Sequence, residues 1–154
     1  GSPTATSRLY PLKDLEAALA RLKAKQTILL FDGMVSRLHS DPKIKNLPPR
    51  WDSAGSSILR IISSDSLSKG LEDDKHRHGL MTYYLLRALR GESDSNRDGS
   101  VTLAEVAAYV SQKVTWAAKT QFSSDQRPLI TPPLKQTDPS SGLVLSKLAA
   151  IRGE

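Results

Sequence analysis

The sequence predicts an α/β fold, and two observations support this prediction. An uninterrupted apolar run, Ile28–Phe31, stops abruptly at Asp32-Gly33-Met34. Such runs are typical of strands that are buried on both faces of a parallel sheet. The elements expected along the chain also follow the order helix, strand, strand, helix, helix, strand. Open α/β sheets place their functional groups at the carboxyl ends of strands, so the first place to look for function is Met34.

Composition narrows the class of protein. A chain of 154 residues with 38% hydrophobic and 25% charged residues suits one globular domain. No apolar run approaches the roughly 20 residues that a membrane-spanning helix requires. The absence of cysteine excludes disulfides, thiolate metal sites and a cysteine nucleophile. The net charge of +6 comes from scattered Lys and Arg residues, which indicates a solvated basic surface rather than a nucleic-acid interface.

The domain is expected to span residues 9–148, between polar tails at 1–8 and 149–154. Gly1-Ser2 resembles a cloning scar, so the localisation of the protein stays open. Leucines at helical spacing predict an amphipathic helix from about Pro11 to Lys25, packed on the sheet. This helix leads into a strand over Thr27–Asp32.

Residues 35–57 form a long irregular segment that contains several Pro and Gly breakers. A second strand is expected over Ser57–Ser63, interrupted by Arg60. Helices are predicted from Gly79 to Leu89, ended by Gly91, and from Thr102 to about Trp116. A terminal strand follows at Gly142–Leu145. Three strands make an incomplete sheet.

The most specific motif is the segment Asp94–Glu105, which fits the twelve-position EF-hand calcium loop at every position that the pattern specifies. Calcium takes six to eight oxygen ligands, and the sixth position requires the turn that Gly99 permits. Val101 is placed to pair with another strand. The expected ligands are Asp94, Asn96, Asp98, Ser100 through its backbone carbonyl, and a bidentate Glu105.

A metal-free interpretation of the same segment is also consistent with the sequence. Thr102 and Glu105 have the spacing of a capping box, and Asp, Asn and Gly residues form turns without a metal. Acids at the first, fifth and twelfth positions favour calcium, because a capped turn does not require them. A single loop without a paired partner is expected to bind calcium weakly.

The segment from His78 to Gly91, followed by the acidic turn and the next helix, resembles the carboxyl half of a caspase-like peptidase domain of the bacterial and metacaspase type. Three further segments are in register with this family: Phe31–Ser36, which is similar to its Asp-x-Cys-x-Ser strand end, Ile58–Asp65, and Gln126–Ile130 with Leu143–Leu145. The resemblance covers about residues 12–148. It implies a three-layer α/β/α sandwich.

The resemblance places the family's catalytic cysteine at Met34, whose thioether cannot form a thiolate or an acyl-enzyme. The family's catalytic histidine lies upstream of this strand, in a region before the start of the chain. His39 and His76 are interpreted as solvated surface residues. No serine near the strand ends lies in a nucleophile elbow or a recognisable triad.

The resemblance further implies that Asp32, with Asp65, lines an acidic pocket that would hold an Arg or Lys of a partner. Asp32 could instead cap local backbone groups, and Met34 could fill core volume. The leading hypothesis is a non-catalytic caspase-like domain that acts in protein binding or assembly and is stabilised by calcium.

Two alternatives remain. The chain could be part of a cysteine endopeptidase whose catalytic His, and Cys, are supplied elsewhere or altered. It could also be a basic, calcium-responsive interaction module. Expected partners are a protein or peptide, the missing amino-terminal half, or a second copy of the chain that pairs with an exposed strand edge. Neither a nucleic acid nor a membrane is expected.

Overall fold

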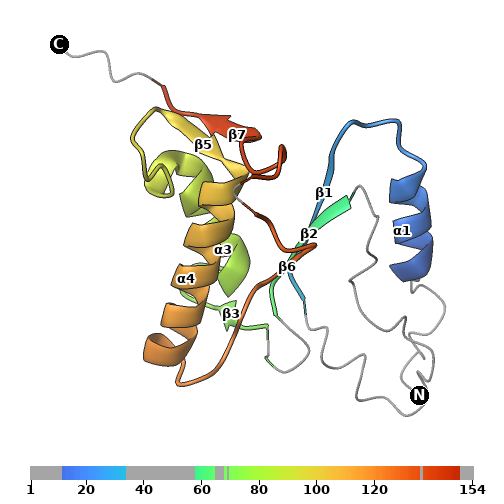
Figure 1. The fold of residues 1–154 in the computed structure, drawn as a ribbon. Coiled ribbons are helices and arrows are strands. Elements are labelled where there is room, and N and C mark those ends of the chain that lie inside the picture. The colour runs from blue at the N-terminus through green and yellow to red at the C-terminus, as the bar shows by residue number, and fades with distance from the viewer. Residues whose placement is uncertain (1–11, 34–57, 65–67, 69, 136, 150–154) are drawn as a thin grey trace, which may run out of the picture.

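The computed structural model describes residues 12–33, 58–64, 68, 70–135 and 137–149 (Figure 1). This part of the chain has a mixed α/β fold, as predicted. Its elements are α1 (Leu12–Ala20), β1 (Thr27–Phe31), β2 (Ile58–Ile62), β3 (Glu72–Asp73), β4 (His78–Gly79), α3 (Leu80–Arg87), the π-helical turn η2 (Ala88–Glu92), β5 (Ser100–Thr102), α4 (Leu103–Gln121), β6 (Leu129–Thr131) and β7 (Val144–Lys147).

The central sheet has the strand order β1-β2-β6. β1 and β2 are parallel, with Ile28 opposite Leu59, whereas β6 is antiparallel to β2, with Ile130 opposite Ile61. The predicted parallel pair is therefore present. Because β1 and β2 point the same way, their carboxyl ends lie side by side and can build one site.

Burial in this sheet differs from the prediction. β1 was expected to be buried on both faces, yet the side chain of Leu30 is 46% exposed and the other β1 residues are only partly covered. Every residue of β2 is buried instead. β2 lies between two strands, whereas β1 has a strand neighbour on one side only among the described residues. Arg60 does not interrupt β2, because it pairs with both Leu29 and Thr131.

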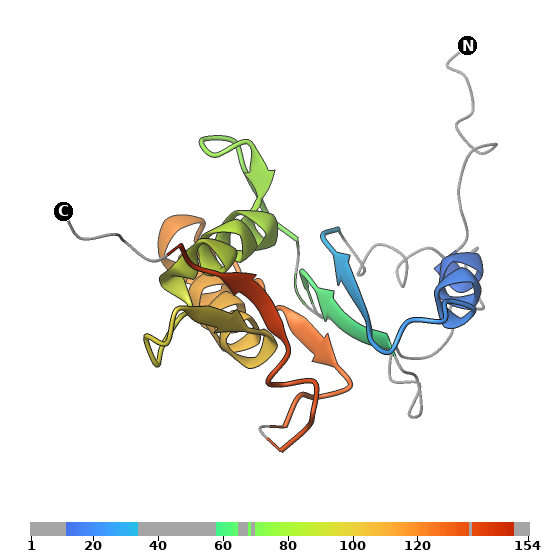
Figure 2. The same ribbon diagram turned by 90° about the horizontal axis from the view of Figure 1, so that it is seen from above.

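Two helices supply most of the hydrophobic core. Buried residues of α4 recur at helical spacing from Leu103 to Ala118, and they pack with Leu80, Met81 and Leu85 of α3. In both views α3 and α4 lie on one side of the central sheet and α1 lies on the other (Figures 1 and 2). The core cluster of the described residues includes no residue of α1, which is also shorter than predicted.

The helix that begins at Leu80 changes direction at Gly91, close to the predicted end. Gly91 has a φ of +111°, and a Cβ atom there would lie 2.8 Å from the side chain of Leu148. Both the left-handed backbone and the close approach require glycine. Leu148, which follows the last strand, is thus packed directly against this turn.

The predicted terminal strand is present as β7, but it does not join the central sheet. It pairs antiparallel with β5 inside the calcium-like segment, with Val101 opposite Ser146. The short hairpin of β3 and β4 was not predicted. Among the described helices, none is long and apolar enough to cross a membrane.

Candidate functional site

The carboxyl end of β1 is attached to the beginning of α3 through Asp32. Its carboxylate accepts hydrogen bonds from the backbone N–H of Thr82, at 3.1 Å, and from the Thr82 hydroxyl, at 2.5 Å. Gly79, the N-cap residue of α3, makes no side-chain capping bond. Asp32 therefore supplies the cap from 50 residues away along the chain. The alternative of local capping is wrong in this respect, because the capped groups belong to a different element.

Gly79 makes this arrangement possible. A Cβ atom at this position would clash with the carboxylate of Asp32. The Cα atom of Gly79 and the end of β1 can approach only because no side chain lies between them. The resemblance aligns the pair His78-Gly79 with the start of a family helix. In the structure this pair contacts the carboxyl end of β1.

A cavity of about 500 Å³ opens beside Asp32. Its acidic lining residues are Asp32 and Glu72, and its basic or titratable ones are Arg77 and His78. The lining therefore carries charges of both signs, whereas the resemblance implied an acidic pocket. Met34 and Asp65 lie outside the described residues. Glu72, Arg77 and His78 were missed because the hairpin that carries them was not predicted.

Buried polar groups hold the ends of β1 and β2 together behind this cavity. The hydroxyl of Ser63 accepts a hydrogen bond from the Gly33 N–H, at 3.0 Å, and donates to the Gly33 carbonyl, at 2.9 Å. Gln126, which is fully buried, accepts from the Leu71 N–H and donates to the Ser63 carbonyl, both at 2.8 Å. Ser63, the last residue of the predicted strand, thus has a structural role.

His76, interpreted from the sequence as a solvated surface residue, keeps 32% of its side chain exposed and also has defined partners. Its Nδ1 atom lies 2.5 Å from the carboxylate of Asp73, and its ring stacks on Tyr83 with the centroids 4.0 Å apart. Burial raises the pKa of Asp73, but hydrogen bonds from His76 outweigh burial and leave this pKa below its usual value. The pair orders the β3–β4 turn beside the cavity. His39 lies outside the described residues.

The segment Asp94–Glu105 has the local geometry of the predicted loop. The Asp98 N–H donates to Oδ1 of Asp94 and to Oδ1 of Asn96, so these two oxygens share one donor. Asp98 in turn accepts from the Ser100 N–H at 2.7 Å. Gly99 has a φ of +79°, as the sixth position of such a loop requires. Val101 pairs with β7, as predicted.

Glu105 is engaged within the protein. Its Oε2 atom accepts from the N–H and hydroxyl of Thr102, and its Oε1 atom accepts from the N–H and hydroxyl of Ser95. The predicted capping box is therefore confirmed. No group of three or more His, Asp or Glu side chains that could hold a metal is formed by the residues that the structure describes. To become the twelfth-position ligand, Glu105 has to exchange hydrogen bonds for the ion.

Glu92, which lies just before the segment Asp94–Glu105, links the start of this segment to α3 and α4. It accepts hydrogen bonds from Arg87 of α3, at 2.6 Å, and from the Tyr109 hydroxyl of α4, at 2.5 Å. The Arg87 guanidinium lowers the pKa of Glu92, although burial opposes this effect. Nothing in the loop motif predicts this anchor, because it depends on how α3 and α4 pack.

We expect the stability of the protein to fall in acid because of Glu105. Burial raises the pKa of Glu105, but hydrogen bonds from Thr102 and Ser95 outweigh it and lower the pKa from 4.5 to about 2. The unfolded chain therefore binds more protons in this interval, and the contribution of Glu105 is present above pH 4.5 and lost as the pH falls towards 2. Urea unfolding at a series of pH values should show a smaller acid loss for Glu105→Gln than for the wild type.

Gln can still complete a capping box, so this variant removes the charge while keeping the shape of the side chain. Asp74→Asn, which alters an exposed carboxylate outside the loop, is the matched control and should keep the wild-type acid loss. Equal acid loss in Glu105→Gln and the wild type would contradict the role assigned to Glu105.

No protein-family model, curated protein or solved structure matches the chain. Function is therefore inferred from the geometry of these sites and from the motif resemblance.

Proposed function

We propose that this chain is a non-catalytic caspase-like domain that binds a protein or peptide at the carboxyl end of β1. The principal support is the chemistry of that strand end. The resemblance assigns the nucleophile to Met34, the chain contains no cysteine, and a cavity of about 500 Å³ lies beside the adjacent Asp32. A cavity of this size accommodates a side chain of a partner.

The lining of the cavity favours a basic side chain flanked by an acidic or neutral one. Oδ2 of Asp32 is engaged by Thr82, while its other carboxylate oxygen and the exposed carboxylate of Glu72 remain as acceptors for an Arg or Lys. Arg77 repels a second positive charge from the same cavity. Mixed lining of this kind selects a pattern of charges rather than net charge alone.

Calcium is proposed as a stabilising ion rather than a catalytic one. The support is the convergence of Asp94 and Asn96 oxygens on one N–H, together with the positive φ of Gly99. The proposed ligands are Asp94, Asn96, Asp98, the Ser100 carbonyl and Glu105. An ion there would be bound far along the chain from Met34, and it would act by fixing the loop and its partner strand β7.

The three-layer α/β/α sandwich of the caspase-like family is proposed as the fold within the broader α/β class. The packing of α3 and α4 with Leu59 and Ile61 of β2 in one hydrophobic core supports one helical layer of this sandwich, whereas α1 contributes no residue to that core. Within the described part of the chain β1 has a strand neighbour on one side only, which favours the alternative that another chain, or a further segment, completes the sheet. In that case the protein would be one part of a peptidase, with the missing catalytic groups supplied elsewhere.

Fluorogenic peptides that end in Arg, Lys or Asp are expected to stay uncut by the purified protein, with or without calcium. Without a thiolate no acyl-enzyme can form. Turnover that disappears on mutation of Asp32 would overturn the proposal. Met34→Cys combined with an added upstream His-Gly segment separates the alternatives: activity in this folded variant would identify a peptidase part, and inactivity would support a binding domain.

A further inference from the structure

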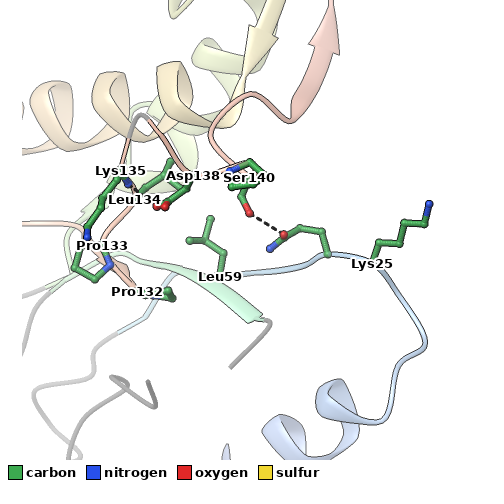
Figure 3. A pocket seen from close by; sticks show the side chains of 10 residues that line it. Lys25, Leu59, Pro132, Pro133, Leu134, Lys135, Asp138 and Ser140 are labelled. Carbon is green, nitrogen blue, oxygen red and sulfur yellow. Dashed lines mark hydrogen bonds between the residues drawn. The ribbon is translucent and has the colours of Figure 1, made fainter. Parts of the chain in front are cut away.

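A second cavity lies at the opposite end of the central sheet, where β1 and β2 begin and β6 ends. Its volume is about 540 Å³, and Figure 3 shows the side chains that line it. It is separate from Asp32, which lies at the other end of β1, and from the segment Asp94–Glu105. Cavities of this volume are in the range that binds small organic molecules.

The walls of this cavity are apolar and stiff. Leu59 of β2 lies between the proline wall and the Ser140 turn in Figure 3, and Pro132, Pro133 and Leu134 form the wall itself. Proline has a fixed φ and no backbone N–H, so two successive prolines offer an apolar surface that moves little and donates no hydrogen bond. These walls suit an acyl chain or an aromatic ring.

The rim is polar, and its charge is mainly positive. Lys25 and Lys135 are both exposed. In Figure 3 Lys135 lies on the proline side near Asp138, and the side chain of Lys25 extends away from Leu59 at the other edge of the cavity. Asp138 is the single acid among the described residues of the lining, and its carboxylate accepts a hydrogen bond from the backbone N–H of Lys135 at 2.7 Å. The ammonium groups sit on flexible four-carbon chains, so both can turn towards a ligand.

Gln26, next to Lys25 in the chain, adds a hydrogen-bond donor to the lining. The Ser140 hydroxyl donates to Oε1 of Gln26 at 2.9 Å, which links the turn after β6 to the start of β1. This bond uses the carbonyl oxygen of the side chain and leaves its NH₂ group as a donor. The side chains of Lys25, Lys135 and Gln26 therefore offer hydrogen-bond donors to a ligand, whereas the walls offer an apolar surface.

We propose that this cavity binds a small organic acid. The apolar body of the ligand lies against Leu59 and the two prolines, and its carboxylate faces Lys25, Lys135 and the Gln26 amide. A positive rim around an apolar pocket complements a molecule that is apolar at one end and anionic at the other. This site is independent of the function proposed for the Asp32 cavity, which offers carboxylates instead.

Octanoate is a suitable probe, and octanol is its neutral match. In a titration of ¹⁵N-labelled protein followed by NMR, octanoate is expected to give saturable shifts centred on the amides of Leu59, Leu134 and Ser140. Octanol should bind the same amides about tenfold more weakly, because it lacks the charge. The double variant Lys25→Gln, Lys135→Gln should bind octanoate at least about fivefold more weakly, since two partly screened charge contacts are lost, and should bind octanol as the wild type does.

The matched control is the double variant Lys119→Gln on α4, Lys147→Gln on β7. It lowers the net charge by the same amount but lies away from the cavity, so it should leave octanoate binding unchanged. Equal binding of octanoate and octanol, or equal losses in the two double variants, would overturn the proposal. A response to an Asp-rich peptide without any response to octanoate would also overturn it, in favour of a protein partner.

Discussion

Calcium at about 10 mM is expected to raise the melting temperature of the wild-type protein by roughly 5–10 °C. A lone loop at the weak end of the EF-hand range has a Kd of about 10⁻⁴ M, so this concentration is about 100 times Kd and stabilises the folded state by about 2.7 kcal/mol. For a chain of this size each kcal/mol shifts the melting temperature by about 2–4 °C. Differential scanning calorimetry with and without calcium measures the shift.

The variant Asp94→Ala should lose nearly all of this shift. It also removes hydrogen bonds to the N–H groups of Asp98 and Gly99, so its melting temperature without calcium will be lower, and the informative quantity is the difference that calcium makes. Asp74→Asn, outside the loop, should retain the full shift. Absence of a shift, with no heat of binding at millimolar calcium, would mean that Asp94–Glu105 is only a capped turn.

Asp32→Ala is expected to lower the free energy of unfolding by about 2 kcal/mol. The substitution removes two charge-assisted hydrogen bonds to Thr82 and leaves the N-terminus of α3 without its cap. Urea unfolding measures the loss. Asp14→Ala, which removes an exposed carboxylate from α1, is the matched control and should change stability by less than about 0.5 kcal/mol.

Gly79→Ala gives an independent test of the same contact. The new methyl group would displace the Asp32 carboxylate, so this variant should be destabilised for the same reason as Asp32→Ala. In the double variant the two losses should overlap, and its total should fall clearly below the sum of the single losses. Additive losses would show that the two residues act separately.

How far the sequence predicts this structure depends on whether a feature is local. In the segment Asp94–Glu105 the turn at Gly99 and the capping box were predicted correctly, because both are set by residues within twelve positions, whereas calcium binding stays a prediction. The strand Ile28–Phe31 was located correctly, but its partial exposure was not, because a run of apolar residues does not reveal how many strands will flank it.

Two of the missed features depend on contacts between distant residues, and a third is a local hairpin that has no sequence pattern. Asp32 was recognised as a candidate site residue, but its partner Thr82 is 50 residues away and has no signature in the sequence. The sequence places Gln126 in a segment that resembles the family's closing segment, but nothing in the sequence indicates that its amide joins Leu71 to Ser63. The β3–β4 hairpin consists of two-residue strands without β-branched residues, so no pattern predicts it.

The attachment of β7 to the loop has a thermodynamic consequence. The Gly99 carbonyl, at the turn of the loop, accepts a hydrogen bond from the Leu148 N–H at 2.8 Å, and the side chain of Leu148 rests on Gly91. Coupling between ion binding and strand pairing is reciprocal. If bound calcium stabilises the pairing of β7 with the loop, then any interaction that stabilises this pairing raises the calcium affinity by the same factor. A mechanical force that separated β7 from the loop would therefore lower the calcium affinity. Conversely, the calcium concentration would change the force needed to separate β7.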